Sequence, residues 1–231
     1  MEDGVPSEAE VEWAVKRLQN NRSGGPSRIR AEDLKGWLAA ARRDEKEREA
    51  RIKDGGDREG EQETQTEAEG HWGRVVEIVQ TSFREGELAE EATWKAVVLI
   101  PKGKGGYRGI VLVEVMWKVV AVILNRRLTS SITFHDFFHG FQAGRGPGTA
   151  TLEAKLLQQL AAMREEVLYV IFLGLTNAYD ALDRSRCLGI LERYGVGPGA
   201  SSYSVTAWRR GRCHIPPGCP GTWTCLKRHT L

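Results

Sequence analysis

The sequence predicts an α+β protein in which helices outnumber strands. Apolar residues recur at helical spacing in several segments, and two short runs rich in β-branched residues, 96–100 and 168–173, are typical of strands. Hydrophobic residues make up 41% of the 231 residues and charged residues 28%, which is ordinary globular usage. This length is enough for one or two modest domains with a core, and the composition excludes a wholly disordered or fibrous chain.

The first helix is predicted over residues 8–20. Ser7 is its expected N-cap, with Glu10 at the capping-box position. The Gly- and Pro-rich turn 23–27 ends it, and a second helix is expected from about Ala31. The apolar residues at helical spacing in the first helix are Val11, Val15 and Leu18.

A charged segment follows at 42–70, with Ile52 as its only large apolar residue. Residues 42 to 69 contain seven basic and eleven acidic side chains. The segment therefore has too few apolar side chains to offset the chain entropy that is lost on folding. We expect the preceding helix to continue for a few turns and then a disordered linker. Helical structure is predicted to resume near His71.

The second half begins with a predicted hairpin, in which a buried strand at 96–100 stops at Pro101 and 107–112 returns beside it. The other predicted elements are helices over 115–128 and 149–163, a strand over 168–173 and a helix over 178–194. The tail 201–231 has no period, which fits either an irregular loop region or an out-of-frame read.

The charge is unevenly distributed. Residues 95–155 contain nine Lys or Arg against three acidic residues, the footprint of a phosphate-binding surface, although an ordinary solvated face gives the same pattern. No apolar run approaches the roughly 20 residues that span a bilayer, and no secretory signal opens the sequence. We therefore expect an intracellular protein without a membrane partner, in the nucleus or the cytoplasm, and leave its oligomeric state open.

The four cysteines are then not expected to form disulfides. Cys213, His214, Cys219 and Cys225 lack a paired C-x₂-C unit, so the spacing does not favour zinc, and we predict no metal site.

Two motifs suggest contact with phosphate. Lys102 ends the first hairpin strand and Arg108 opens its partner, so two cations are expected side by side at the hairpin tip. A Gly-rich loop at 138–148, containing Gly144 and Arg145, leads into a helix N-terminus. Alone, the hairpin is equally typical of a solvated turn, and a Gly-rich loop of this kind is more often a plain turn.

The order of the motifs resembles the reverse transcriptase domain of non-LTR retrotransposons and group II introns. Ile-Pro-Lys at 100–102, Tyr-Arg-Gly-Ile at 107–110 and Gly-Phe-x-x-Gly-Arg at 140–145 precede a strand that leads into Ala-Tyr-Asp-x-Leu-Asp-Arg at 178–184. The turn 23–27 looks like that family's opening motif. The resemblance covers about residues 8 to 200.

This resemblance implies a partial right-hand polymerase fold that works on RNA and DNA with Mg²⁺. The fingers would comprise residues 1–41 and 71–165, and the palm would begin in 166–200. By resemblance, the residues that hold the incoming nucleotide are Lys102, Arg108 and Tyr179, and those that touch the template are Gly144 and Arg145.

Two departures bear on activity. The family's first metal-binding Asp falls at Gly174, and the nearby Asp180 and Asp183 are expected to cap or pair on the following helix. The second palm motif, aromatic-Ala-Asp-Asp, does not occur in the 231 residues. We therefore expect a truncated reverse transcriptase with an incomplete palm, no thumb, no intact catalytic residue and no bound cofactor. The alternatives are a non-catalytic nucleic-acid-binding module and a translated remnant without function.

Overall fold

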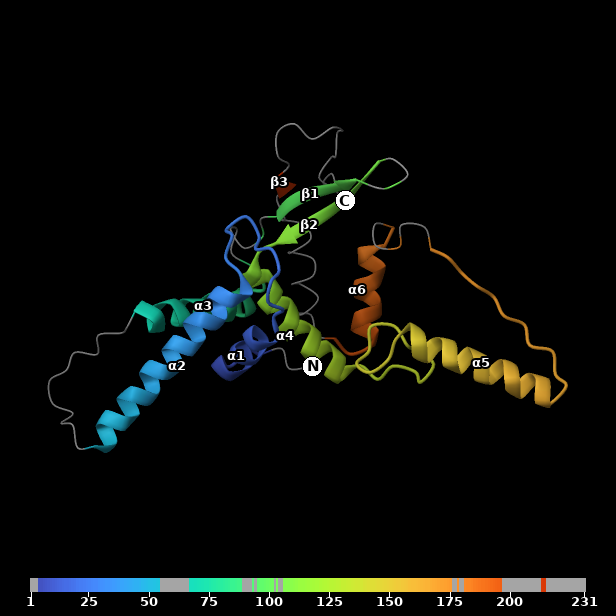
Figure 1. Ribbon diagram of the computed structural model, residues 1–231, viewed down its shortest axis with the longest axis horizontal. Coiled ribbons are helices and arrows are strands. Elements are labelled where there is room, and N and C mark those ends of the chain that lie inside the picture. The colour runs from blue at the N-terminus through green and yellow to red at the C-terminus, as the bar shows by residue number, and fades with distance from the viewer. Residues whose placement is uncertain are drawn as a thin grey trace.

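The computed structural model has the α+β architecture that the sequence predicts, with six helices and a small sheet of order β2-β1-β3 among the described residues (Figure 1). The structure describes residues 4–54, 67–88, 93, 95–101, 103, 106–175, 178, 181–196 and 213–214. No helix in these ranges combines the length and apolar character needed to cross a membrane.

Helix α1 (Glu8–Arg17) begins as its capping signal predicts. The Oγ of Ser7 accepts a hydrogen bond from the backbone N–H of Glu10 at 3.2 Å, which satisfies one of the free donors of the first turn. The helix ends at Arg17, three residues before the predicted end, and Leu18 caps it.

Helices α2 (Ala31–Lys53) and α3 (Glu67–Glu85) shorten the predicted linker from both sides. Residues 42–53 form the outer turns of α2, as expected from a second helix that continues for a few turns before the linker (Figure 1). Glu, Lys, Arg and Ala have high helix propensity, so this run stays helical with few apolar contacts. Helix α3 begins before His71, and residues 55–66 lie outside the described residues.

The hydrophobic core lies among α1, α2, α3 and α4 (Val115–Ser131). Apolar residues at three- and four-residue spacing point inward from each helix, and each large side chain so buried contributes about 1.5–3 kcal/mol. The fully buried large residues include Val11, Val15, Leu34, Val79, Val119, Val120 and Ile123.

The hairpin forms in the predicted place, from β1 (Lys95–Pro101) and β2 (Tyr107–Val113). The strands are antiparallel, with Pro101 opposite Tyr107 at the turn end. The prediction that the first strand is buried is wrong, because Val98 and Ile100 are 43% and 45% exposed. The described helices pack mainly against one another and leave the hairpin uncovered.

The tail, predicted to be irregular, contributes one short element to this sheet. Strand β3 (Cys213–His214) pairs in parallel with Lys95 and Ala96 of β1. The rest of 201–231 lies outside the described residues.

The chain from α5 onward makes few contacts with the helical core. Helix α5 (Pro147–Met163) forms as predicted but has no buried residue. The predicted strand 168–173 is wrong, because the chain there is in no regular element and its side chains are exposed. Helix α6 (Arg184–Arg193) begins six residues after the predicted start, with Asp183 as its N-cap. A strand needs a neighbouring edge, and within the described residues none lies beside 168–173.

Candidate nucleic-acid interface

Arg108 lies near the tip of the hairpin, directly opposite Ile100. Its side chain is exposed, and its guanidinium has no hydrogen-bond or ion-pair partner among the described residues. Lys102, its predicted companion, lies outside the described residues. Arg108 can therefore offer its full set of donors to a phosphate.

The hairpin is tied to the opening turn through Glu114, the residue that joins β2 to α4. The Glu114 carboxylate accepts the backbone N–H of Ser27 at 2.8 Å and the Ser27 hydroxyl at 2.5 Å. Gly25 lies so close that an added Cβ would stand 2.7 Å from the Glu114 Cα. The turn 23–27 and the base of the hairpin thus form one packed unit.

Glu114 is a structural residue of this unit that none of the sequence motifs contains. It is 6% exposed and lies in an otherwise apolar run from 109 to 117. A single acidic residue in such a run is costly to bury unless it is paired. The position of Glu114 among apolar residues was therefore the sequence signal that it has a partner in the fold.

Arg145 is engaged within its own loop. Its Nη1 donates to the backbone carbonyls of Asp136 and Phe138, and its Nη2 lies 3.5 Å from the Asp136 carboxylate. Gly144 has φ +75°, a left-handed conformation that favours glycine, and that conformation turns the chain just before Arg145. These contacts order the loop and leave fewer Arg145 donors for a template.

The same loop is fastened to α5 by His139. The ring Nδ1 lies 2.9 Å from the Thr149 hydroxyl, and Nε2 contacts the Glu153 carboxylate. The Thr149 hydroxyl also caps the helix, since it accepts the N–H of Gly146 at 2.9 Å. The fastened loop presents exposed aromatic rings, with Phe141 at 94% exposure.

Several cations of the basic stretch 95–155 make contacts within the protein. Arg127 is buried and pairs with Glu10 at 2.7 Å, and the Arg126 guanidinium stacks 4.1 Å from the Trp13 ring centroid. The Lys118 ammonium donates to the Ser23 carbonyl at 3.1 Å. Among the described cations of 95–155, Arg108 and Lys155 have no such partner, so the outward basic surface is smaller than the sequence count suggests.

The position at which the resemblance expects a metal-binding Asp carries no side-chain oxygen. Gly174 is in an open part of the chain where an added Cβ would meet nothing within 4 Å. Asp183 does not substitute for it: one carboxylate oxygen accepts the N–H of Arg186 at 3.1 Å and the other lies 3.3 Å from its guanidinium. Tyr179 and Asp180 lie outside the described residues. The described residues therefore do not fit a two-magnesium centre.

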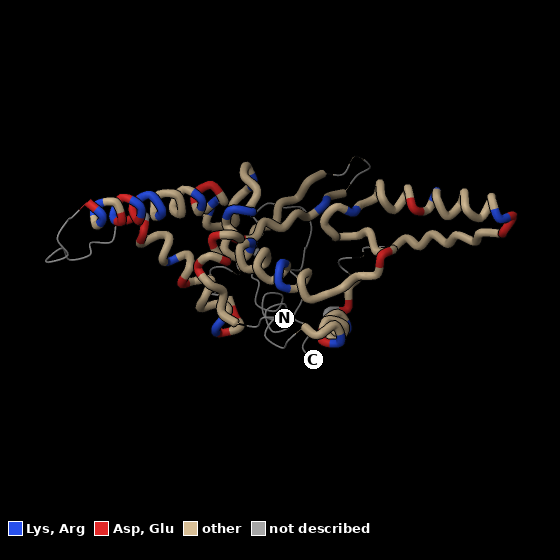
Figure 2. Tube along the Cα trace, turned by 90° about the horizontal axis from the view of Figure 1, so that it is seen from below, with Lys and Arg blue, Asp and Glu red and all other residues tan. Residues whose placement is uncertain are grey.

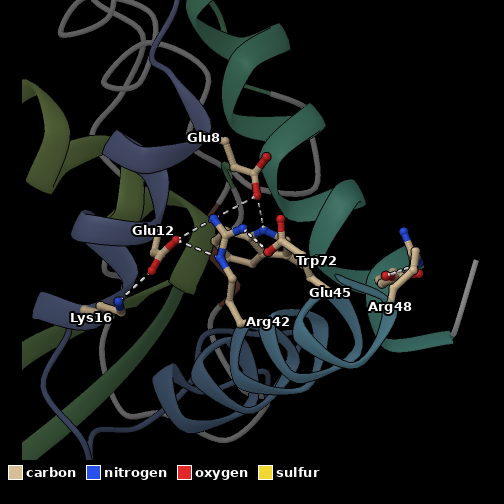
Figure 3. A network of polar contacts seen from close by, with 8 residues as sticks. Glu8, Glu12, Lys16, Arg42, Glu45, Arg48 and Trp72 are labelled. Atoms are coloured by element: carbon tan, nitrogen blue, oxygen red, sulfur yellow. Dashed lines mark hydrogen bonds and ion pairs between the residues drawn. The ribbon is translucent and has the colours of Figure 1, made fainter. Parts of the chain in front are cut away.

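The largest described ionic network lies away from these motifs and holds the helices together (Figure 3). The Arg42 guanidinium contacts Glu12 at 2.7 Å, Glu45 at 2.6 Å and Glu8 at 3.3 Å. The indole N–H of Trp72 donates to Glu8 at 2.9 Å, which brings α3 into the network. Its position between α1, α2 and α3 makes it structural.

Hydrogen bonding explains the pKa shifts in this network. Hydrogen bonds from Lys16 and then Arg42 lower the pKa of the Glu12 carboxyl below its usual value. The same carboxylate, followed by Glu45, raises the pKa of the Arg42 guanidinium. Both groups are therefore held in their charged forms at neutral pH.

Comparison with protein-family models and with curated proteins found no match to this chain. The motifs above and their geometry are therefore the basis for any assignment of function.

Proposed function

We propose that this chain is part of a retroelement-type RNA-directed DNA polymerase that binds nucleic acid but does not polymerise by itself. In this proposal residues 1–41 and 71–165 act as the fingers. Arg108, with Lys102, contacts phosphate at the hairpin tip, and the loop with Gly144 and Arg145 faces the template strand. Tyr179 supports the sugar of the incoming nucleotide.

The link between Ser27 and Glu114 is the observation that supports this proposal most. The opening turn 23–27 and the hairpin motif at 107–110 both belong to the resemblance and lie far apart along the chain. A carboxylate at the base of the hairpin holds them together through hydrogen bonds of 2.8 Å and 2.5 Å. Motifs that are brought to one place are expected if they serve one binding surface.

The lack of polymerisation follows from the carboxylates. Two-metal nucleotidyl transfer needs oxygen ligands for both ions, and Gly174 supplies none at the family's position. The 231 residues also lack an aromatic-Ala-Asp-Asp motif. We therefore expect binding without Mg²⁺-dependent primer extension.

The test is binding of a fluorescein-labelled single-stranded RNA, followed by anisotropy from about 50 to 200 mM salt. The Arg108→Ala variant should weaken binding and reduce the slope of log affinity against log salt by about 1, because one phosphate contact is lost. Arg51→Ala is the matched control, since Arg51 is exposed near the end of α2 and the charge change is identical.

Two results would overturn parts of the proposal separately. Equal effects of the two Arg variants, or binding that does not respond to salt, would remove the phosphate-binding role of the hairpin. Primer extension that requires Mg²⁺ would remove the non-catalytic part.

A further inference from the structure

Residues 167–175 form an apolar segment that leaves the end of α5 and runs back toward α6 (Figure 1). The segment contains no charged residue, and its β-branched and aromatic side chains favour extended structure. On its odd-numbered face every side chain is more than three-quarters exposed: Val167 76%, Tyr169 87%, Ile171 82%, Leu173 87% and Leu175 81%.

Within the described residues, the backbone of the apolar segment also lacks hydrogen-bond partners. Glu166 donates its N–H to the Ala161 carbonyl at 2.9 Å, and beyond it no backbone hydrogen bond joins 167–175 to another described residue. An extended run with free N–H and C=O groups on both sides is a template for another strand.

The exposed area is larger than a soluble monomer usually tolerates. Tyr169 and Phe172, at 87% and 91% exposure, present roughly 300–400 Å² between them, since aromatic side chains bury about 150–250 Å² each. Six further apolar side chains of the segment are exposed. Together these eight side chains can supply the ~800 Å² per partner of a standard interface, and they exceed the largest patch of a typical monomer, about 300–600 Å².

We infer that a second copy of this chain covers the apolar segment, by antiparallel pairing about a two-fold axis at Ile171. Identical segments are self-complementary around such an axis, so one apolar strand supplies the partner for the other. The inference rests on the exposed surface and does not depend on the polymerase proposal.

The register follows from the charges that flank the segment. An axis at Ile171 pairs all nine residues of 167–175 with one another and sets Glu166 and Glu165 opposite the uncharged Thr176 and Asn177. Moving the axis to Val170 would place Glu166 opposite Gly174 and Glu165 opposite Leu175, inside the apolar pairing. Moving it to Phe172 would place Val167 and Leu168 opposite the polar pair.

The uncharged surface also argues against a nucleic-acid occupant, which would require cations. Residues 167–175 contain no Lys, Arg, Asp or Glu, so the trace of the apolar segment is tan (Figure 2). A second copy satisfies both the apolar side chains and the unpaired backbone.

The oligomeric state of the full chain tests this inference. Sedimentation velocity at about 1–100 μM should show a monomer–dimer equilibrium, since unrelated specific interfaces of this size fall in that range or tighter. Ile171→Lys should raise the dissociation constant at least tenfold, because it places two like charges at the axis. Ile52→Lys, at an exposed isoleucine of α2, makes the same change elsewhere and should leave the dimer intact.

Cysteine cross-linking then tests the register. In Ile171→Cys the two introduced thiols would lie on directly opposite residues of the paired strands. The Cα atoms of such residues are within the roughly 4.4–6.8 Å that a disulfide spans, so mild oxidation should link position 171 of one copy to position 171 of the other. In Leu175→Cys the two copies of residue 175 would lie about 27 Å apart along the strands and should not link. Peptide mapping identifies the bond among the native cysteines.

Several outcomes would overturn the inference. One is a monomer at every concentration, which would mean that the chain's own 197–231 or nothing at all covers the segment. Another is an oligomer that Ile171→Lys does not weaken. The last is a polydisperse aggregate without a 171–171 bond, which would indicate non-specific association.

Discussion

Ser27 and Glu114, 87 residues apart in the sequence, share two hydrogen bonds that join the opening turn to the base of the hairpin. The Glu114 side chain is buried, and both of its carboxylate oxygens accept a hydrogen bond from Ser27. The pair connects two parts of the chain that carry separate sequence motifs. The coupling energy between the two side chains can be measured with single and double mutants.

Ser27→Ala and Glu114→Gln should be coupled. Ser27→Ala should lower the free energy of unfolding by about 1–3 kcal/mol, because it leaves an oxygen of the buried Glu114 carboxylate without its hydroxyl donor. Glu114→Gln should lower it by about 0.5–1.5 kcal/mol, because the exposed Ser27 hydroxyl can bond water instead. The double mutant should lose less than the sum, with a coupling energy of about 0.5–3 kcal/mol in urea titrations. Ser131→Ala is the control, since that hydroxyl bonds the Arg127 carbonyl in its own helix. Additive effects would show that the hydrogen bonds contribute no mutual stabilisation.

Gly25→Ala should destabilise the fold, and Gly36→Ala should not. The new methyl at position 25 would stand 2.7 Å from the Glu114 Cα, and both backbones would have to shift. The methyl at position 36, within α2, meets nothing within 4 Å and should stabilise the helix by about 1 kcal/mol. Thermal unfolding followed by circular dichroism measures both. Equal melting temperatures would disprove the close packing at Gly25.

Glu12→Gln should reduce stability at neutral pH and have little effect in acid. The pKa of the Glu12 carboxyl is lowered on folding, so its contribution is present above its unfolded pKa and is lost as pH falls through the folded value. We expect a loss of at most about 1 kcal/mol near pH 7, because solvent screens the pair. Urea titrations from pH 7 to pH 3 should show the difference from the wild type shrinking below about pH 4.

Glu49→Gln is the matched control for that experiment. Glu49 is exposed on α2, the helix that carries Arg42, and has no ion pair among the described residues. A difference from the wild type that is as large as that of Glu12→Gln would assign the effect to net charge.

Gly174→Asp should be tolerated by the fold and should not create a polymerase. The added side chain enters open space, so the melting temperature should change by less than a few degrees. Two-metal transfer needs further carboxylates, and these 231 residues contain no aromatic-Ala-Asp-Asp motif. Primer extension with labelled deoxynucleotides and Mg²⁺ should remain at background. Extension that appears only in the Asp variant would show that one carboxylate sufficed.

Local signals determined the start of α1, the position of the hairpin and the existence of α2 to α5. Ser7 and Glu10 form their capping contact without help from distant residues, and helical periodicity is a property of each segment alone. The charged composition of 42–70 predicted a few more helical turns and then a linker, but it did not predict the residue at which α2 ends, which is Lys53.

Burial and pairing were decided by tertiary structure. Residues 96–100 and 168–173 are both apolar and contain β-branched side chains, yet the first has a hairpin partner 8 to 16 residues further along the chain, and the second has no neighbouring strand among the described residues. The sequence also could not show that Arg127 pairs internally with Glu10, or that Ser27 meets Glu114. A strand edge, a buried ion pair and a covered apolar face each need a partner from elsewhere in the chain, and only the three-dimensional arrangement supplies or withholds it.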